Sequence, residues 1–456
     1  AAVTALKAEL YRQLYLRAVK KGDAEVKSEY EKMFHFAENT LPDQGLSIVP
    51  INITYYPIRP GKNLVYRLAH LFFKKLPNVL EEELLVEGNL LLSEVDISIY
   101  FGKPIGMQEY LSPVLPVMTT VAPWAGIERS VDLTLDLLKT RLTTRMMRDV
   151  YERLTINFDH LYCSGLRALE SSRVAVDDFH AALYLAAREV QSSGARASHR
   201  SIAEGMVNIV TGEPFEPLDS IRRLAAADGV TTVEGGHYLI NQTTFGEQHD
   251  FEDIRIKNTI AVIANEIEPL RKVVKVIHSY VNLPRQQLHR RLSEVLMRED
   301  LAEYEADYAA CADAPERKGA DVGRPYLLDR PGSDIGVVLS HGYLSAPQEV
   351  RFLAEHLHRQ GFSVYVARMK GHGTIPKQLD HVRWQDWMRC YERAHTIMRN
   401  RCRHVVTGGF STGGLLALLA AARAGDSVAG TFAINAPQSL ADLKSLLVPA
   451  VAQWNK

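Results

Sequence analysis

The chain has 456 residues, a length that is typical of about three domains. Lys and Arg number 53 and Asp and Glu 54, so the net charge of −1 excludes a nucleic-acid binder driven by bulk charge, and we expect no nucleic-acid partner. No apolar run is long enough to cross a bilayer. Four widely spaced cysteines predict reduced thiols and no metal site: Cys163, Cys311, Cys390 and Cys402.

Both ends of the chain look cut. It opens on AAVTALKAEL with neither Met nor a signal-peptide pattern, and it closes on an apolar helical pattern without a cap. We interpret it as part of a longer polypeptide. We expect a cytoplasmic location, in which peripheral contact with the inner face of the membrane is also open.

Residues 1–110 combine helical and strand patterns. Helices are expected over 1–21 and on to about residue 39. The alternating stretches 46–56 and 95–105 predict strands, with helical patterns between them. This order predicts an α/β block.

Residues 111–310 are mainly helical by pattern. One β signal interrupts them at 228–241, where two short strands flank Gly235-Gly236 and predict a hairpin. Helices followed by a hairpin resemble a winged-helix layout, which occurs in interaction modules as well as in DNA readers.

A basic stretch lies within this helical region. Residues 271–291 contain six Lys or Arg and no acid, and Val273 and Ile277 follow the helical spacing of an apolar face. Such a helix is able to rest on anionic lipid headgroups. The alternative is a solvated basic face on a helix packed into the protein.

The C-terminal part alternates strands and helices. Residues 311–334 are charged, then rich in Gly and Pro, and predict a linker. From 335 to 456, short apolar strands alternate with helices, which predicts a parallel sheet covered on both faces.

The motif that points most directly to chemistry is G-x-S-x-G at 409–413. It follows an apolar strand and opens an apolar helix, the setting in which a serine sits on a tight, strained turn. Ser411 is therefore the candidate nucleophile, with Gly409 and Gly413 allowing close approach of the chains. The backbone N–H of Thr412 would face a developing oxyanion.

A second oxyanion donor is expected after an earlier strand. His341-Gly342-Tyr343 follows the first strand of the block, so the Tyr343 amide is the candidate. His341 and His372 precede the serine. For both, the alternative is a turn histidine bonded to the backbone.

The stretches 341–374 and 384–387, together with GGFSTGG, resemble serine α/β-hydrolases of the monoacylglycerol lipase and small carboxylesterase type. The resemblance covers about 335–456 and implies Ser411 as nucleophile with Tyr343 and Thr412 as oxyanion hole. That family continues with an Asp or Glu and then a His. Here no histidine follows His404, so the triad acid and base are absent and these residues alone are expected to be inactive.

A second resemblance concerns the N-terminal block. IVPINITYYPIRPGKN at 48–63 and the stretch 84–105 look like the C-terminal half of a glycerolipid acyltransferase, in which Pro50 would line the acyl pocket. The resemblance implies acyl-CoA or acyl-carrier protein as donor, no bound cofactor, and glycerol-phosphate or acylglycerol substrates. His381 and Asp386 match His-x₄-Asp but lie in the wrong block, so the base is expected upstream of Ala1.

Three hypotheses remain open. The leading one is part of a bifunctional lipid enzyme, joining acyl transfer onto a glycerol-phosphate acceptor to serine-dependent acyl ester hydrolysis; residues 111–310 would then be a helical extension of the acyltransferase. In the second, only the hydrolase is active and 1–310 is a scaffold. In the third, the protein is a non-catalytic module that binds a membrane or a partner. Chain-length and head-group specificity, oligomeric state and any shared substrate stay undetermined.

Overall fold

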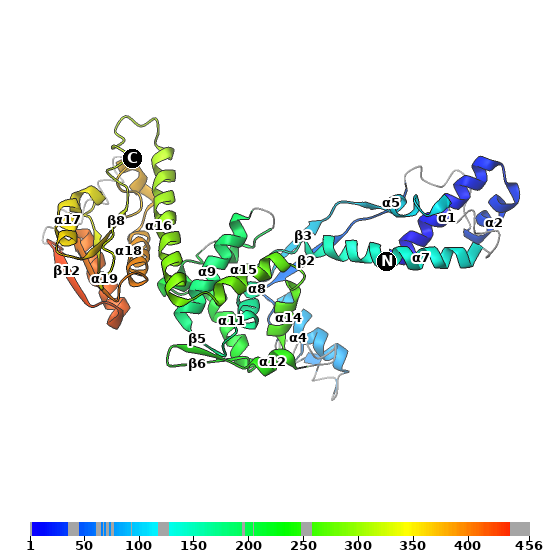
Figure 1. Ribbon diagram of the computed structural model, residues 1–456, viewed down its shortest axis with the longest axis horizontal. Helices are drawn as coiled ribbons and strands as arrows, with labels where there is room; N and C mark the ends of the chain where they lie inside the picture. The colour runs from blue at the N-terminus through cyan, green and yellow to red at the C-terminus, as the bar shows by residue number, and fades with distance from the viewer. Residues whose placement is uncertain are drawn as a thin grey trace.

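The computed structural model arranges the chain in three regions. Figure 1 shows N-terminal helices at one end, a helical middle region, and a C-terminal sheet with its helices at the other end. The described residues are 2–34, 45–60, 65–66, 68–69, 73, 77–92, 94–116, 127–193, 197–203, 205–247 and 258–437. None of the described helices is both long and apolar enough to span a bilayer.

The N-terminal region is built from helices and an antiparallel ribbon. Its helices are α1 (Ala2–Lys21), α2 (Ala24–Phe34), α4 (Asn78–Leu92), α5 (Met107–Leu111) and α7 (Ile127–Tyr151). Leu6 and Leu10 of α1 are buried with Met107 and with Leu142 of α7, which forms a small separate core.

The ribbon differs from the predicted α/β block. Strand β2 (Ile51–Tyr56) pairs antiparallel with β3 (Asp96–Phe101), and β1 (Ser47–Ile48) pairs antiparallel with β4 (Ile105–Gly106). Pro50 lies between β1 and β2, where its carbonyl accepts the Gly102 N–H at 2.7 Å. The strands were predicted at the right places, but among the described residues of this region they form no parallel sheet.

One face of the ribbon is apolar and open to solvent. Ile51 opposes Phe101, Ile53 opposes Ile99, and Tyr55 opposes Ile97. All six side chains are exposed, up to 66% for Phe101. The helices of an α/β layer would bury such a face, so the described residues do not reproduce the expected acyltransferase layer.

The middle region is helical around a large core, as the sequence predicted. Its helices are α8 (Phe158–Ala168), α9 (Val176–Ser192), α10 (Asn208–Thr211), α11 (Glu216–Ala227), α12 (Gln242–Gly246), α14 (Thr259–Glu266), α15 (Arg271–Val281) and α16 (Arg285–Ala310). The predicted hairpin is present as β6 (Thr231–Glu234) and β7 (His237–Ile240), with Gly235 and Gly236 at positive φ. A third strand, β5 (Arg173–Ala175), pairs with β7 and was not predicted.

Helix α15 carries the basic stretch. Val273 and Ile277 are buried in the main core, while Arg271, Lys272 and Lys275 are exposed. Because the apolar side of α15 is already packed inside the protein, it is not available to insert into a bilayer. The geometry is that of a solvated basic face on a packed helix.

The C-terminal region contains a five-stranded sheet of order β12-β11-β9-β10-β8. Strands β9, β10, β11 and β12 run parallel, as predicted, and β8 is antiparallel to β10. Strand β8 lies inside the predicted linker 311–334, so part of that stretch belongs to the sheet. The elements are β8 (Tyr326–Leu328), β9 (Ile335–Ser340), α17 (Arg351–Arg359), β10 (Ser363–Ala367), α18 (Trp384–Arg399), β11 (His404–Phe410), α19 (Thr412–Ala424) and β12 (Gly430–Ile434).

Both faces of this sheet are covered. Val337, Leu339, Val364 and Val366 point to one face, in a core with Ala354 of α17. Val338 and Tyr365 point to the other, in a core shared with α18, α19 and α16. The main core therefore runs from the middle region through α16 to the sheet (Figure 1).

Candidate active site

Ser411 occupies the turn between β11 and α19. Its backbone has φ 53° and ψ −119°, a strained conformation for a residue with a Cβ. The turn is held because the Ser411 N–H donates to the Ile434 carbonyl at 2.8 Å and the Gly414 N–H donates to the Ser411 carbonyl at 2.9 Å. The side chain of Ser411 is half-buried at the carboxyl end of the sheet.

The flanking glycines are required by close packing. A Cβ on Gly409 would lie 2.3 Å from the carbonyl carbon and oxygen of Gly413, and one on Gly413 would lie 2.5 Å from the carbonyl oxygens of Ser340 and His341. These contacts bring β11, α19 and the loop after β9 together. The motif thus permits the sharp turn because Gly409 and Gly413 have no Cβ that would clash with the backbone.

The loop after β9 lies beside Ser411. Ser340 of β9 and Gly409 of β11 are register partners in neighbouring parallel strands, so the segments that follow both strands leave the sheet at its carboxyl end. A Cβ on Gly342 would lie 3.4 Å from the Ser411 Cβ. Within the described chain, the amides of Tyr343 and Thr412 donate no hydrogen bond to a protein group. Two N–H groups without a protein acceptor thus lie near the serine, where the sequence predicts an oxyanion hole.

Glu349 holds the loop after β9 through a hydrogen bond to its backbone. Its Oε2 accepts the Gly342 N–H at 2.8 Å. Sequence reasoning missed Glu349, because a carboxylate in a short helical stretch has no spacing signal that connects it to a glycine amide.

His341 is buried and both of its ring nitrogens face the backbone. Its Nε2 accepts the Met369 N–H at 3.2 Å, which leaves Nδ1 to donate to the Gly342 carbonyl at 2.9 Å. Burial, with a smaller effect from His372, lowers the pKa of His341 to about 3. This geometry matches the alternative of a turn histidine and leaves no free nitrogen to take a proton from Ser411.

His372 packs next to His341 beneath two aromatic rings. Its ring lies 5.1 Å from that of His341, 5.3 Å from Trp387 and 5.9 Å from Tyr343. Burial lowers the pKa of His372 to about 4. Its Nδ1 lies 3.2 Å from the Lys370 carbonyl, and its buried Nε2 has no protein partner.

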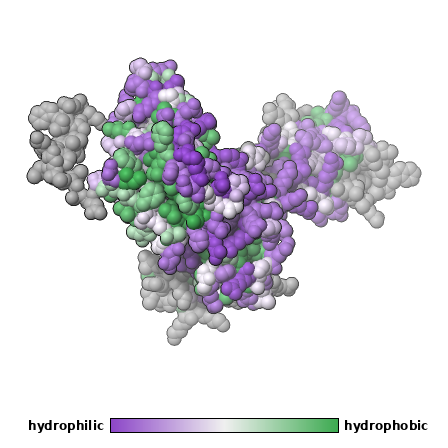
Figure 2. Space-filling model, turned by 60° about the vertical axis from the view of Figure 1, so that its left-hand side comes forward, coloured by the Kyte–Doolittle hydropathy of each residue, from purple (hydrophilic) through white to green (hydrophobic). Residues whose placement is uncertain are grey.

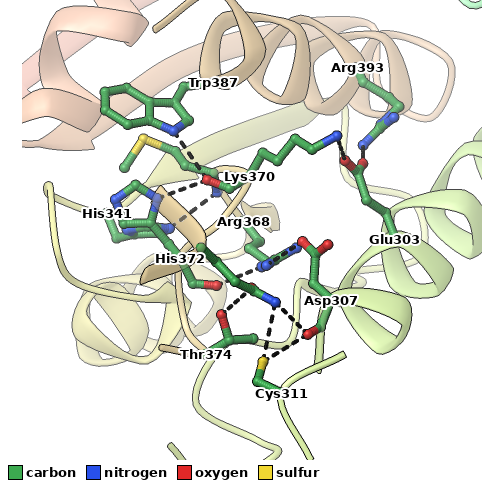
Figure 3. Close-up of polar contacts among 12 residues, drawn as sticks. Glu303, Asp307, Cys311, His341, Arg368, Lys370, His372, Thr374, Trp387 and Arg393 are labelled. Carbon is green, nitrogen blue, oxygen red and sulfur yellow. Dashed lines mark hydrogen bonds and ion pairs between the residues drawn. The ribbon is translucent and has the colours of Figure 1, made fainter. Parts of the chain in front are cut away.

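Helix α16 reaches the loop that carries His372 (Figure 3). Asp307 pairs with the buried Arg368 at 2.7 Å, and the Arg368 Nε donates to the His372 carbonyl at 2.7 Å. Glu303 pairs with Lys370 at 3.3 Å. Because the Met369 N–H in the same loop donates to His341, a chain of contacts links α16 to residues 341–343, which we call the oxyanion loop after its predicted role.

The same helix is anchored to α18 and to the sheet. Arg393 pairs with Asp300 and, at 2.6 Å, with Glu303, and the Tyr365 hydroxyl donates to Asp300 at 2.6 Å. Breaking a buried pair of this kind by removing one partner typically costs about 3–5 kcal/mol. Helix α16 therefore ties the middle region to the C-terminal region, although it precedes the predicted hydrolase stretch.

The arrangement can position an attacking hydroxyl and stabilise an oxyanion. A serine hydroxyl also needs a base to take its proton, and the two nearby histidines are engaged by backbone or buried under aromatic rings. Other apolar side chains are exposed near this end, including Leu415 and Leu418 of α19 and Ile434 of β12. Figure 2 shows apolar surface gathered on this part of the molecule.

Comparison with known proteins agrees with this geometry. A family model described as serine aminopeptidase, S33, matches residues 333–456. Residues 333–456 therefore resemble a serine α/β-hydrolase in sequence, and their parallel sheet is consistent with that fold. No comparison gives evidence of an acyltransferase domain, so the N-terminal half of the leading hypothesis is without support.

Two curated relatives are a monoacylglycerol lipase and a carboxylesterase. A thermostable monoacylglycerol lipase of Bacillus sp. (strain H-257) is 34% identical over 102 residues, which are 22% of this chain and 40% of that protein. A carboxylesterase of Bacillus subtilis (strain 168) is 27% identical over 88 residues, 19% of this chain and 36% of that protein. The chain thus spans well under half the length of these relatives.

A solved structure from work on LipS and LipT, two metagenome-derived lipolytic enzymes, is also similar. It is 34% identical, covers 27% of this chain and 49% of that one, and superposes with a TM-score of 0.26.

The predicted site residues fall into two groups. The structure brings Ser411, Thr412, Gly409, Gly413, Gly342, Tyr343 and His341 to one edge of the sheet. Pro50 lies instead in the N-terminal ribbon, with its carbonyl in a strand-type hydrogen bond. Its acyl-pocket role rests on the resemblance alone.

Proposed function

We propose that the C-terminal region is the nucleophile-bearing half of a serine ester hydrolase that acts on acyl esters, with acylglycerols as the substrate class. The observation that carries this is the strained Ser411 beside the unbonded amides of Tyr343 and Thr412. The relatives, a monoacylglycerol lipase and a carboxylesterase, support the ester class.

The reaction would begin with attack of the Ser411 Oγ on the ester carbonyl. The carbonyl oxygen would take up negative charge and accept hydrogen bonds from the Tyr343 and Thr412 amides. Collapse of this intermediate would release the alcohol and leave an acyl-serine, which water then hydrolyses. No histidine follows His404, and both ring nitrogens of His341 are bonded to the backbone, so this proposal assigns no proton-transferring base.

Residues 1–310 are proposed as a scaffold for this hydrolase rather than as an acyltransferase. The observation that favours a scaffold is α16, whose Asp300, Glu303 and Asp307 bind charged residues of the hydrolase region. Two observations do not support the acyltransferase hypothesis. The described N-terminal residues form no parallel sheet, and the matching family model covers residues 333–456 instead.

The test is hydrolysis of short- and medium-chain p-nitrophenyl esters and of monoacylglycerols by the full-length protein. Ser411→Ala should remove the activity. Ser427→Ala, which changes an exposed serine between α19 and β12, should leave the activity unchanged. Activity that survives in Ser411→Ala would refute the proposal and favour a non-catalytic role for this domain.

A further inference from the structure

A cleft lies at the amino ends of the parallel strands, whereas Ser411 lies at their carboxyl ends. It has a volume of about 740 Å³, and its lining includes Ser333, Ser363 and Arg403, which lie at or just before the starts of the parallel strands β9, β10 and β11. Three segments form its walls: the first turns of α16, the turn between β8 and β9, and the end of α18 with the loop that follows. Active-site chemistry takes place at the other ends of these strands, so the cleft is a separate site.

The lining of this cleft is strongly basic. Six guanidinium groups line it, those of Arg285, Arg290, Arg330, Arg399, Arg401 and Arg403, together with the His289 ring, against a single lining carboxylate, Asp329. We call this the arginine cleft.

Some of these charges are already paired. Asp329 binds Arg401 at 2.6 Å, and Asp178 binds His289 at 2.7 Å and Arg285 at 3.4 Å. Two further pairs join Arg290 to Glu294 at 2.9 Å and Arg399 to Asp177 at 3.4 Å. Arg330 and Arg403 are exposed and make no ion pair within the described chain. The cleft therefore keeps at least two uncompensated guanidinium groups.

One further observation points to an anionic occupant. Helix α16 begins at the cleft with Pro284 as its N-cap, which supplies no side-chain cap to the first N–H groups. The N-terminus of a long helix carries partial positive charge and favours anions.

We propose that the arginine cleft binds a small molecule that carries two or more phosphate groups. Guanidinium groups present paired donors that match phosphate oxygens, and such charge-assisted contacts are stronger than neutral ones. Cationic groups on three separate walls favour several phosphates over one. The net charge of −1 over the whole chain argues against a long nucleic acid as the occupant.

The phosphates could belong to a soluble compound or to a lipid headgroup, and two probes separate these sources. The first is inorganic pyrophosphate, titrated calorimetrically into the 456-residue protein at low salt. The second is co-sedimentation with phosphatidylcholine vesicles that contain or lack phosphatidic acid. Saturable pyrophosphate binding without vesicle binding supports a soluble ligand, and cleft-dependent binding of both supports a headgroup.

The decisive variant is Arg330→Gln/Arg403→Gln, which removes two exposed charges without breaking an ion pair. Loss of a charged hydrogen bond costs about tenfold in affinity for each arginine, so binding should weaken about a hundredfold. The matched control is Arg271→Gln/Lys272→Gln on α15, which removes the same charge from an exposed surface outside the cleft.

The control should change the affinity by less than about twofold. Arg330→Lys/Arg403→Lys keeps the charge but not the paired donors, so it should give an intermediate affinity. Absence of saturable binding to either probe, or equal weakening in the control variant, would overturn the proposal. Ester hydrolysis is not part of the readout, so the outcome is independent of the proposed enzyme activity.

Discussion

At the scale of single residues, the glycines around Ser411 carry the geometry of the site. Gly413→Ala would place a Cβ against the carbonyl oxygens of Ser340 and His341, and neither backbone group can move without disturbing β9. We expect a loss of stability of about 3 kcal/mol or more, visible as a lower midpoint in urea unfolding.

Gly319→Ala is the matched control for that substitution. Its Cβ would meet only the Val322 side chain, at 4.0 Å, so the change should stay within about 0.5 kcal/mol. Similar unfolding midpoints for the two variants would show that the turn at Ser411 is looser than this packing requires.

The buried histidines make stability depend on pH. The pKa values of His372 and His395 are lowered to about 4 and that of His341 to about 3, in each case mainly by burial. An unfolded histidine titrates near pH 6.5, so below that pH the unfolded state binds more protons. Stability should therefore be fully present above pH 6.5 and fall as the pH drops towards 4, by about 1.4 kcal/mol per pH unit and histidine.

Urea unfolding between pH 7.5 and 4.5 checks this expectation. His341→Gln and His372→Gln should each flatten the pH dependence, because a glutamine at these positions does not titrate. A midpoint that stays constant over this range would contradict the assignment of these histidines as neutral.

Residue identities were predictable from sequence where a motif fixes them, and not elsewhere. G-x-S-x-G identified Ser411 because the turn needs glycine at fixed offsets. Glu349 and Asp307 hold the same site by long-range contacts; Asp307 lies 61 positions from Arg368. No local pattern encodes such a pair, since its geometry exists only after α16 has docked.

At the scale of elements, α16 is expected to set the shape of the oxyanion loop. Asp307→Asn would leave Arg368 buried without its carboxylate, and the loop from Arg368 to His372 would lose its support. We expect faster amide hydrogen exchange at residues 341–343, by about tenfold, and in the full-length protein a lower kcat for ester hydrolysis with little change in KM.

Glu305→Gln is the control on the same helix. Glu305 pairs with Arg324 at 3.2 Å on the surface, where an ion pair contributes little. Its exchange and its kinetic constants should match the unsubstituted protein. If both variants behave alike, α16 acts only as packing and does not position the oxyanion loop.

The elements of the C-terminal sheet were predictable because each strand is a short apolar run next to a helical pattern. Strand β8 was not, because its three residues follow a Gly- and Pro-rich stretch that predicts a linker. In the N-terminal region the alternation predicted strands at 46–56 and 95–105, but alternation does not specify a partner. Their antiparallel pairing, with an exposed apolar face, follows from tertiary context alone.

At the scale of the whole molecule, the division into regions reflects how the core is shared. The main core is continuous from α8 and α9 through α16 to the sheet, whereas α1 and α7 pack in a core of their own. Composition and chain order predicted a helical middle and a parallel sheet. They did not predict that α16 joins the two. The acidic residues of α16 have the sequence pattern of a solvated surface, and only the structure shows that Asp300 and Asp307 pair with Arg393 and Arg368.

The last prediction concerns the reactivity of the 456-residue chain. It holds Ser411 and the two proposed oxyanion donors, but the His341 ring is bonded to the backbone, the His372 ring is enclosed by aromatic side chains, and no histidine follows His404. In another serine hydrolase, loss of triad members leaves a rate only about 10³–10⁴ above the uncatalysed reaction. We therefore expect slow labelling of Ser411 by a fluorophosphonate probe and little hydrolysis of an activated aryl ester. Ser411→Ala in the same chain gives the background. Fast stoichiometric labelling would show that a base within these residues reaches the serine, and His341→Gln and His372→Gln would then tell which histidine it is.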